Sequence, residues 1–256
     1  MTVPTPDEMH ALYAYALGRI AGLGPGGCSE RVGPWLCIDA GMGVSKFNIA
    51  VVVDEVSKPR PALREAMEWF AARGINARLD LRGSTDGALL AASMVEDFQF
   101  WWREPAMVLN PLPPAFEPLI GLEVREALNE DDFDLYCRVD SEEYSDQEFQ
   151  RAMVAKAATM EGVTIHLGIA DGRPVARSMA VTRGELVGVH NVYVPPSQRS
   201  KGYGAELTAA AIQAGRAAGA SSACLEATAL GFPVYERMGF RRYDDYLTVG
   251  TDGPPG

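Results

Sequence analysis

The chain has 256 residues, of which 47% are hydrophobic and 22% are charged, a composition typical of a globular protein with one large or two smaller domains. Its net charge of −11 comes without any basic run, which argues against a nucleic-acid partner, because nucleic-acid binders carry a basic face. No stretch approaches the roughly 18 apolar residues of a membrane span, so we expect no membrane partner.

The cysteines and histidines form no metal-binding pattern. The four cysteines are irregularly spaced without a Cys-x-x-Cys pair, and the three histidines lie far apart. This pattern favours a reduced protein that holds no metal. The first residues are acidic and lack the basic region of a signal peptide, so we expect a cytoplasmic protein.

The first part of the chain alternates strands and helices. Glycine and proline punctuation and the spacing of apolar residues predict the following elements. They are a helix over 7–24, a strand over 47–54, a helix over 61–74, a strand over 77–81, a helix over 84–98 and a strand hairpin over 99–110.

A proline-rich stretch then divides the chain. Residues 110–118, "NPLPPAFEP", carry four prolines in nine positions. Proline continues neither a helix nor a central strand, so the stretch reads as a linker. We therefore expect one domain over 1–112 and a second over 119–250.

The second part predicts a three-stranded meander between helices. Asp171-Gly172 is a good hairpin signal within this meander. The predicted elements are a strand over 121–128, acidic helical stretches around 130–140 and 146–160, three β-rich runs within 163–194, a helix over 203–218, a strand over 221–228, a short helix over 233–238 and a strand over 240–249.

A glycine-containing turn joins the meander to the following helix. Its sequence, "RSKGYGA", places Arg199, Gly202 and Gly204 in an Arg-x-x-Gly-x-Gly pattern. The first N–H groups of a helix have no internal partners, and glycines let a ligand approach the backbone closely, so this turn can bind a phosphate. The pattern is unspecific by itself, and a tight turn with solvated basic residues explains it equally well.

A second motif follows about thirty residues downstream. In "VYERMGF", Tyr235 precedes Gly239 and Phe240 in a Tyr-x-x-x-Gly-Phe pattern. This combination is rare by chance, and both motifs stand in strand-then-helix order. With the two motifs together, residues 119–250 resemble the GNAT superfamily of acetyl-CoA-dependent N-acetyltransferases.

The resemblance implies an α/β (α+β) fold, in which a mixed, mostly antiparallel sheet is flanked by helices and preceded by a smaller α/β domain. The sheet is expected to splay between strands 186–194 and 221–227, with the cofactor acetyl-CoA in the splay. No metal is implied. The implied cofactor-binding residues are Val192, Tyr193, Val194, Arg199, Ser200, Lys201, Gly202, Tyr203, Gly204, Ala205 and Thr228.

Two of these assignments carry their own reasoning. The main chain of 192–194 is expected to pair with the pantetheine arm, as a ligand adds to a strand edge. Many relatives have asparagine where this chain has Thr228, whose hydroxyl keeps one hydrogen bond but not the amide pair.

The catalytic candidates are Tyr235 and His190. Tyr235 matches the family's tyrosine that protonates the departing thiolate, although it also reads as a packing residue. Relatives often use a strand glutamate as the base, yet residues 188–191 hold no carboxylate. His190 is the candidate base there, because its ordinary pKa suits the role, and a structural histidine is the alternative.

Three glutamates are rivals to His190, acting through water. These are Glu142 and Glu143, which are also the candidate substrate-binding residues or else part of a solvated loop, and Glu226. Strand alternation predicts that His190, Val192 and Val194 share one face, with Asn191 and Tyr193 on the other.

The first part, 1–112, has the rhythm of half a GNAT domain but lacks both motifs. It resembles a degenerate GNAT-like domain that supports the second domain or shapes the amine pocket, and an unrelated small α/β domain is the alternative.

The predicted function is an N-acetyltransferase that moves an acetyl group from acetyl-CoA to a primary amine of a small molecule or peptide, by direct attack in a ternary complex. The alternative is a catalytically weak CoA-binding sensor or scaffold protein. A Rossmann enzyme fits less well, because its glycine loop follows the first strand of a β-α-β unit rather than a meander. The sequence assigns no oligomeric state.

Overall fold

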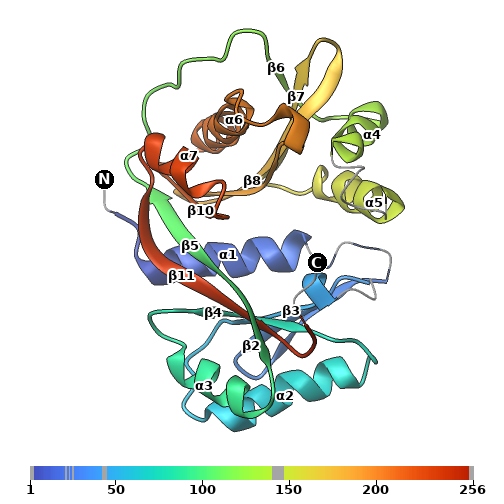
Figure 1. Ribbon diagram of the computed structural model, residues 1–256, viewed down its shortest axis with the longest axis vertical. Helices are drawn as coiled ribbons and strands as arrows, with labels where there is room; N and C mark the ends of the chain where they lie inside the picture. Colours follow the sequence, from blue (N-terminus) through green and yellow to red (C-terminus); the bar gives the residue numbers. More distant parts are fainter. Residues whose placement is uncertain are drawn as a thin grey trace. The chain divides into compact units, whose positions relative to one another are not determined.

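The computed structural model describes residues 3–20, 22, 24, 26–41, 45–139 and 147–253. The chain forms two compact units (Figure 1). Unit 1 comprises residues Met1–Leu12 and Met107–Arg241, and unit 2 comprises Tyr13–Ala106 and Arg242–Gly256. The final strand therefore belongs to unit 2, whereas the sequence-based division placed it in the second domain. The domain assignment 1–112 and 119–250 stays a prediction.

Unit 1 is built on five neighbouring strands in the order β10-β9-β8-β7-β6. Their bounds are β6 Glu123–Glu126, β7 Val163–Ala170, β8 Arg173–Arg183, β9 Leu186–Tyr193 and β10 Ser222–Glu226. All neighbours are antiparallel except β9 and β10, which are parallel. The predicted mixed, mostly antiparallel sheet is confirmed.

The turn between β7 and β8 explains why these strands form a tight hairpin. Asp171 and Gly172 both have left-handed backbones, with φ of 50° and 72°. Two successive positive φ values fit the right-handed twist of a two-residue hairpin, and aspartate and glycine tolerate them best. The hairpin signal in the sequence is confirmed.

Helices cover both faces of the unit 1 sheet. They are α4 Glu130–Arg138, α5 Gln147–Ala157, α6 Tyr203–Ala217 and α7 Phe232–Arg237. Adjacent residues of β8 identify the faces, because neighbouring side chains in a strand point to opposite sides. The Arg177 guanidinium carbon lies 4.5 Å from the centre of the Tyr136 ring of α4, whereas Ser178 Oγ donates to Leu207 O of α6 at 2.9 Å. The two helices therefore lie on opposite faces.

The contact between α6 and β9 is very close. A Cβ atom at Gly215 of α6 would stand 2.4 Å from Cβ of Val187 in β9. Only glycine fits there without moving one of the backbones, so this residue sets the depth at which α6 packs on the sheet. The apolar core on this face includes Val189, Leu225 and Tyr235.

The proline-rich stretch at 110–118 is a packed part of unit 1. The Arg216 side chain of α6 donates to Pro113 O at 2.6 Å, and Leu112 N donates to Ser221 O at 3.0 Å. The side chain of Phe116 packs against the core beneath α6. The expectation of a linker is corrected: proline stops regular structure, but Pro113 O still accepts a hydrogen bond and Leu112 N still donates one within unit 1.

Unit 2 has the strand order β1-β2-β3-β4-β11-β5. Its elements are α1 Pro6–Ile20, β1 Cys28–Val32, β2 Trp35–Asp39, β3 Ile49–Val52, α2 Pro59–Ala71, β4 Arg78–Arg82, α3 Gly87–Val95, β5 Gln99–Leu109 and β11 Arg241–Gly250. Helix α1, strand β5 and the first residue of β11 extend into unit 1. Strands β3 and β4 are parallel, and β11 is antiparallel to β4.

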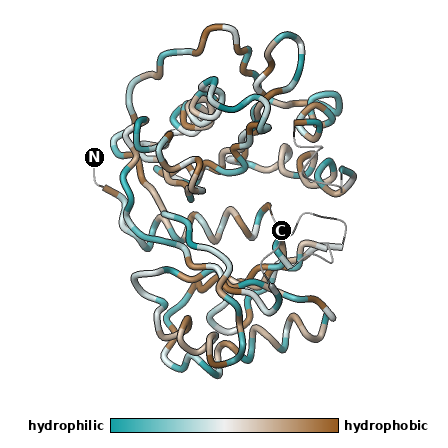
Figure 2. The backbone as a smooth tube through the Cα atoms, in the orientation of Figure 1, coloured by the Kyte–Doolittle hydropathy of each residue, from teal (hydrophilic) through white to brown (hydrophobic). Residues whose placement is uncertain are grey.

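Helix α2 shows why this unit folds as it does. Hydrophobic and hydrophilic residues alternate along its turns (Figure 2). Leu63, Ala66 and Phe70 are buried in a core with Leu79 and Leu81 of β4. The spacing of three and four residues puts the helix's apolar side chains on one face, as the sequence predicted.

Two sequence predictions fail in unit 2. Residues 99–109 form one long strand, β5, rather than a hairpin, and Pro105 lies inside it. The hairpin of β1 and β2 was not predicted, although Gly33 occupies its turn with a φ of 54°. The "REP" sequence reads locally as a turn, and only the neighbouring strands of the sheet hold it extended.

Candidate functional site

The turn before α6 has the geometry of an anion site. Ser200 and Gly202 both have left-handed backbones, with φ of 63° and 85°, and Gly202 is the N-cap of the 15-residue helix α6. Residues 199–202 are exposed. The backbone N–H groups at the start of this helix therefore face solvent. The positive end of the helix dipole lies at the same place, and the two together attract a phosphate.

The basic side chains of this turn fold back onto it. Arg199 Nε donates to Val194 O at 3.1 Å, and Lys201 Nζ donates to Gln198 Oε1 at 2.8 Å. These contacts tie the turn to the end of β9 and keep both positive charges beside the helix start. Tyr203, Gly204 and Ala205, in the first turn of α6, are half-buried.

A bulge interrupts β9 directly before the predicted cofactor strand. Met179 of β8 pairs with His190, but Arg177 pairs with Tyr193, so two residues of β9 stand opposite Ser178. Asn191 adopts a φ of 52° there. An extra residue of this kind breaks the two-residue alternation of a strand.

The bulge overturns the predicted assignment of faces. Val192 packs against the core beneath α6, whereas Tyr193 pairs with Arg177, whose side chain points to the α4 face. His190 pairs with Met179, in the same alternation as Arg177. His190 and Tyr193 therefore share the α4 face, and Val192 points to the opposite one.

Strands β9 and β10 separate after a short pairing. The parallel register runs over three residue pairs and ends at Cys224 and Gly188, although β9 continues to Tyr193 and β10 to Glu226. The separation begins just before the bulge. The edge of β9 between His190 and Tyr193 thus leaves its neighbour, the position where a ligand's amide groups can pair with a strand.

The His190 side chain lies over Gly188 on the α4 face. A Cβ atom at Gly188 would stand 2.6 Å from His190 Nε2, and this nitrogen is buried without a hydrogen-bond partner among the described residues. Burial lowers the pKa of His190 to about 4, because the imidazolium would lose its hydration. The imidazole is therefore neutral at pH 7 and is a weak proton acceptor.

The same face carries a stacked cation. The Arg177 guanidinium carbon lies 4.5 Å from the centre of the Tyr136 ring and 5.6 Å from that of Tyr193. A guanidinium between two aromatic faces gains cation–π attraction while it is buried. This stack fixes the Tyr193 ring beside the bulge.

Tyr235 of α7 is buried on the other face of the sheet, beneath α6. Its ring centre lies 5.8 Å from that of Phe240. Burial raises the pKa of Tyr235 to about 12, against the opposing effect of the Thr208 side chain in α6, and the Glu226 charge raises it further. The phenol is therefore protonated at neutral pH and can donate a proton.

The remaining predicted residues have other local roles. Thr228 Oγ1 accepts a hydrogen bond from Gly231 N at 3.2 Å, so it closes the turn that leads into α7 while its own proton stays available. Glu226, at the end of β10, is half-buried and acts electrostatically on Tyr235 and Cys224. Glu142 and Glu143 lie outside the described residues.

Two residues that shape the site were not predicted from the sequence. A Cβ atom at Gly231 would stand 2.8 Å from Cε2 of Tyr235, so glycine makes room for the ring. Gly188 likewise leaves space for His190. Both are glycines whose role depends on a contact made in the folded chain, which no spacing pattern records.

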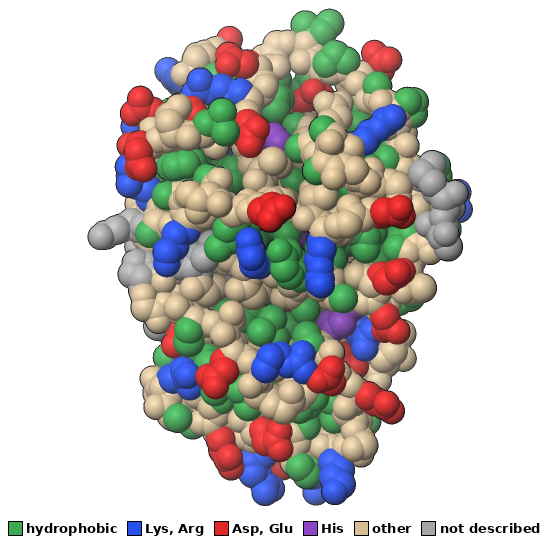
Figure 3. Space-filling model, turned by 180° about the vertical axis from the view of Figure 1, so that it is seen from behind, with side chains coloured by type: hydrophobic (Ala, Val, Ile, Leu, Met, Phe, Trp, Pro, Cys, Tyr) green, Lys and Arg blue, Asp and Glu red, His purple; other side chains and the backbone are tan. Residues whose placement is uncertain are grey.

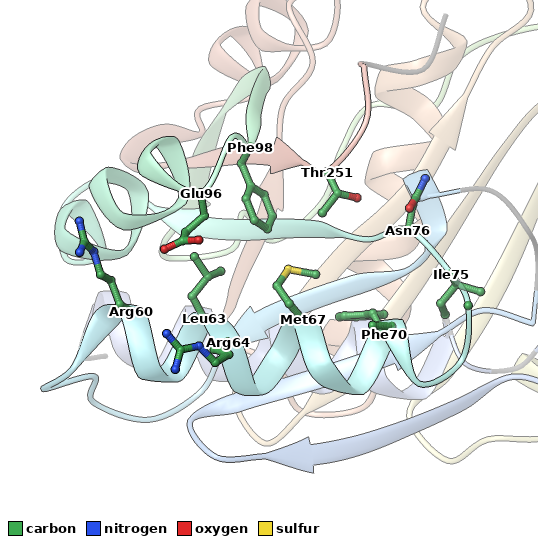
Figure 4. A pocket seen from close by; sticks show the side chains of 12 residues that line it. Arg60, Leu63, Arg64, Met67, Phe70, Ile75, Asn76, Glu96, Phe98 and Thr251 are labelled. Atoms are coloured by element: carbon green, nitrogen blue, oxygen red, sulfur yellow. The ribbon is translucent and has the colours of Figure 1, made fainter.

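A separate hollow of about 510 Å³ lies in unit 2 (Figure 4). It is bordered by α2 and by residues next to α3, β5 and β11. Leu63, Met67 and Phe98 line its apolar part, and Arg64 and Glu96 lie at one end. None of the predicted site residues lines it. Its charged residues are all exposed, so it is an open groove of the surface.

Neither the surface charge nor a cluster of metal ligands marks a second site in the described part of the chain. Lys and Arg side chains are interspersed with Asp and Glu on the face that Figure 3 shows. Within the described part of the chain, no three His, Cys, Asp or Glu side chains gather as metal ligands. In that same part, no helix is both long and apolar enough to cross a membrane.

Comparison with known proteins identifies a family. The family model described as "Probable histone acetyltransferase Rv0428c C-terminal" matches residues 20–247, which is most of the chain. Comparison with curated proteins gave no match.

Several solved structures share the fold. The GCN5-related N-acetyltransferase from Kribbella flavida superposes with a TM-score of 0.71 at 19% identity, over 97% of this chain and 96% of that one. The tandem GNAT protein from the clavulanic acid biosynthesis pathway gives 0.61 at 14%, over 98% and 97%. A GCN5-related N-acetyltransferase from Sphaerobacter thermophilus gives 0.61 at 16%, over 81% and 73%. At these identities the likeness concerns the fold.

Proposed function

We propose a reaction for this chain from the premise that it belongs to the family described as "Probable histone acetyltransferase Rv0428c C-terminal", and with it to the GNAT superfamily of acyl-CoA N-acyltransferases. The chain moves an acetyl group from acetyl-CoA to a primary amine of a small molecule or peptide. The amine attacks the thioester directly while both substrates are bound.

The observation that carries this proposal is the strand-turn-helix at 186–217. The turn offers backbone N–H groups at the start of α6, with Gly202 at a φ of 85°. The edge of β9 that separates from β10 lies directly before it. A pyrophosphate on the turn and an extended amide chain along the strand edge suit these two features, and acetyl-CoA combines both groups.

The proposed cofactor contacts follow from that placement. The main chain of Val192, Tyr193 and Val194 pairs with the pantetheine arm. Because Val194 O already accepts a hydrogen bond from Arg199, Val194 pairs with the arm through its N–H. The turn and the helix start bind the pyrophosphate through Arg199, Ser200, Lys201, Gly202, Tyr203, Gly204 and Ala205. Thr228 keeps a hydroxyl proton to donate.

The chemistry balances with two proton transfers. The acceptor ammonium first loses one proton, and its nitrogen then forms a bond to the carbonyl carbon. The carbon–sulfur bond breaks as the nitrogen loses its second proton. One proton ends on the sulfur of CoA and the other in solvent, so the products are an amide and a free thiol.

Tyr235 is the proposed acid and His190 the proposed base. Tyr235 is protonated at neutral pH and lies in the core cluster with Val189 and Leu225, where β9 and β10 separate. His190 is neutral and lies next to the bulge. Its low pKa makes a water-mediated relay through Glu142, Glu143 or Glu226 the rival, and Glu142 and Glu143 are also the proposed substrate-binding residues.

A second candidate function is a CoA-binding sensor or scaffold protein with weak turnover. The observation in its favour is that the proposed site has no strong base. Residues 188–191 hold no carboxylate, and burial leaves His190 with a pKa of about 4. A protein of this kind would bind acetyl-CoA as well as an enzyme does, so binding and turnover must be measured separately.

Titration calorimetry with acetyl-CoA tests the cofactor site. We expect micromolar binding that is lost in Gly202→Asp, because the new carboxylate stands where the pyrophosphate is proposed to bind. Gly184→Asp is the matched control: its glycine also has a positive φ, 59°, in the turn between β8 and β9, with open space around it. Gly184→Asp also places a negatively charged residue at a positive φ, but away from the turn before α6, so it should keep the wild-type affinity for acetyl-CoA.

The outcomes separate the candidates. If neither the wild type nor Gly184→Asp binds acetyl-CoA, the proposal is wrong. If both bind, a panel of small amines and lysine-containing peptides, which the family description makes worth including, is assayed for free thiol release. Turnover with any of them supports the enzyme, and binding without turnover favours the sensor.

A further inference from the structure

Arg177 is a buried cation on the α4 face of the unit 1 sheet. It is 6% exposed, and its guanidinium carbon lies 4.5 Å from the ring centre of Tyr136 in α4 and 5.6 Å from that of Tyr193 in β9. Tyr136 is itself completely buried. The guanidinium therefore joins a fixed ring of the helix to the half-buried ring of a residue on the proposed cofactor strand.

The end of β9 beyond the bulge has few contacts within the described sheet. The parallel pairing with β10 ends at Gly188, and the register with β8 passes from His190 directly to Tyr193. Asn191, between these two pairs, has a φ of 52°, a backbone that costs free energy in most residues other than glycine. Because the ladder is interrupted here, side-chain contacts must keep this segment extended.

Side chains hold the segment at three points. Val192 packs in the core beneath α6, Tyr193 stacks with Arg177 on the α4 face, and Arg199 Nε donates to Val194 O at 3.1 Å. Val192 and Tyr193 are neighbours in the chain and point to opposite faces. Holding both side chains therefore fixes the main chain between them, and the Arg177 stack supplies the contact on the α4 face.

We propose that Arg177 is a positioning residue, which acts through Tyr193 to hold the main chain of 192–194 extended before acetyl-CoA binds. The inference rests on the proposed function, since it needs the pantetheine arm along this strand edge. A strand edge that is already extended loses little conformational freedom when a ligand pairs with it. Without the stack, the segment is extended for only part of the time, and the affinity falls in proportion to that fraction.

The size of the loss should depend on which part of the ligand is present. In the proposed complex the pantetheine arm lies along 192–194, whereas the pyrophosphate lies on the turn before α6. The fragment 3′-phospho-ADP carries the pyrophosphate and the adenosine but lacks the arm, so its binding should not depend on Arg177. General damage to the fold would weaken the binding of both ligands alike.

Arg177→Met is the central test, because methionine keeps an unbranched side chain and removes the cation. We expect the Kd for acetyl-CoA, measured by titration calorimetry, to rise about 10-fold. The Kd for 3′-phospho-ADP, measured by its competition with acetyl-CoA, should stay within about 2-fold of the wild type. An equal loss for the two ligands would overturn the proposal.

Two further variants serve as controls. Arg177→Lys should weaken acetyl-CoA binding by only about 3-fold, because an ammonium keeps the cation–π attraction but cannot stack as a plane. Arg173→Met removes an exposed arginine at the start of the same strand, so neither Kd should change. A loss in Arg173→Met as large as in Arg177→Met would assign the effect to net charge and contradict the proposal.

A double-variant cycle tests whether Arg177 acts through Tyr193. Tyr193→Leu removes the other side of the stack, so it should weaken acetyl-CoA binding about as much as Arg177→Met. The two changes together should cost little more than one alone, because either one breaks the stack. Losses that multiply would show that Arg177 acts by another route. If the melting temperature shows that Arg177→Met does not fold, Tyr193→Leu carries the comparison of the two ligands.

The proposal and the proposed function fail differently. If the wild type does not bind acetyl-CoA, the proposed cofactor strand is wrong, and the role of Arg177 falls with it. If the wild type binds acetyl-CoA and Arg177→Met keeps the Kd within about 2-fold, only the role of Arg177 is overturned.

Discussion

His190 shows how far a single residue can be understood from its surroundings. Its residue type fits a base, and the bulge after it places it on the α4 face with Tyr193. Its packing over Gly188 buries Nε2, and this burial lowers the pKa to about 4. His190 was chosen as the base for its ordinary pKa, but in the folded chain it is a weaker base than an exposed histidine.

The pH dependence of kcat/KM tests His190. A base must be neutral to accept a proton, and His190 is neutral well above pH 4. We expect no inflection near 6.5 in kcat/KM between pH 5 and 8, and a loss of about 10-fold or more in His190→Ala if it is the base. An inflection near 6.5 that vanishes in His190→Ala would contradict the lowered pKa. A loss below about 3-fold would favour the glutamate relay instead.

At the scale of single residues, the sequence predicts which residues are candidates for the site better than it predicts what surrounds them. Tyr235 and the turn before α6 were predicted as site residues by motif, and the geometry of the turn agrees with an anion site. Gly231, which leaves room for the Tyr235 ring, was not predicted, because its role depends on a contact that the spacing of residues does not show.

The bulge in β9 is the decisive feature among the elements. It places two residues opposite Ser178 and gives Asn191 a φ of 52°. Asparagine tolerates this left-handed backbone better than most residues, and a β-branched side chain tolerates it worst. The sequence therefore permits the bulge, but simple alternation assigned the wrong faces to the residues beyond it.

Substitutions at Asn191 test whether the bulge is a fixed feature of the fold. Asn191→Val should lower the free energy of unfolding by about 1–2 kcal/mol, because a β-branched residue is strained at positive φ. Asn191→Gly should stay within about 0.5 kcal/mol of the wild type. Urea denaturation measures both, with Thr182→Val on the neighbouring strand as a control at ordinary φ. Equal stability of the two Asn191 variants would contradict a left-handed backbone there.

At the scale of the whole molecule, burial acts on titratable groups in both units. Unit 2 holds Asp245 with Arg103 and Arg242, and although burial opposes its ionisation, these partners lower its pKa. Unit 1 holds His166 and His190, whose pKa values burial lowers to about 4. These histidines fold neutral, whereas an unfolded histidine binds a proton near pH 6.5.

Stability should therefore decline in mild acid. The stabilising effect of the lowered histidine pKa values is fully present above pH 6.5 and is lost as the pH falls towards 4. Each histidine contributes up to about 3 kcal/mol over this range. Denaturant titrations between pH 7.5 and 5 measure the slope above the range where carboxylates titrate. His166→Leu should reduce the slope, and an unchanged slope in this variant would contradict the burial effect.

The sequence by itself determined most elements of the fold and the two motifs of the site. The hairpin at Asp171-Gly172, the helix that begins after Gly202 and the amphipathic α2 depend on local backbone preferences and periodicity, which a sequence records directly. Tertiary structure alone decided that β5 is one strand, that the proline-rich stretch packs on unit 1, and that β11 joins unit 2. It also decided the faces of β9, because these depend on contacts between residues far apart in the chain.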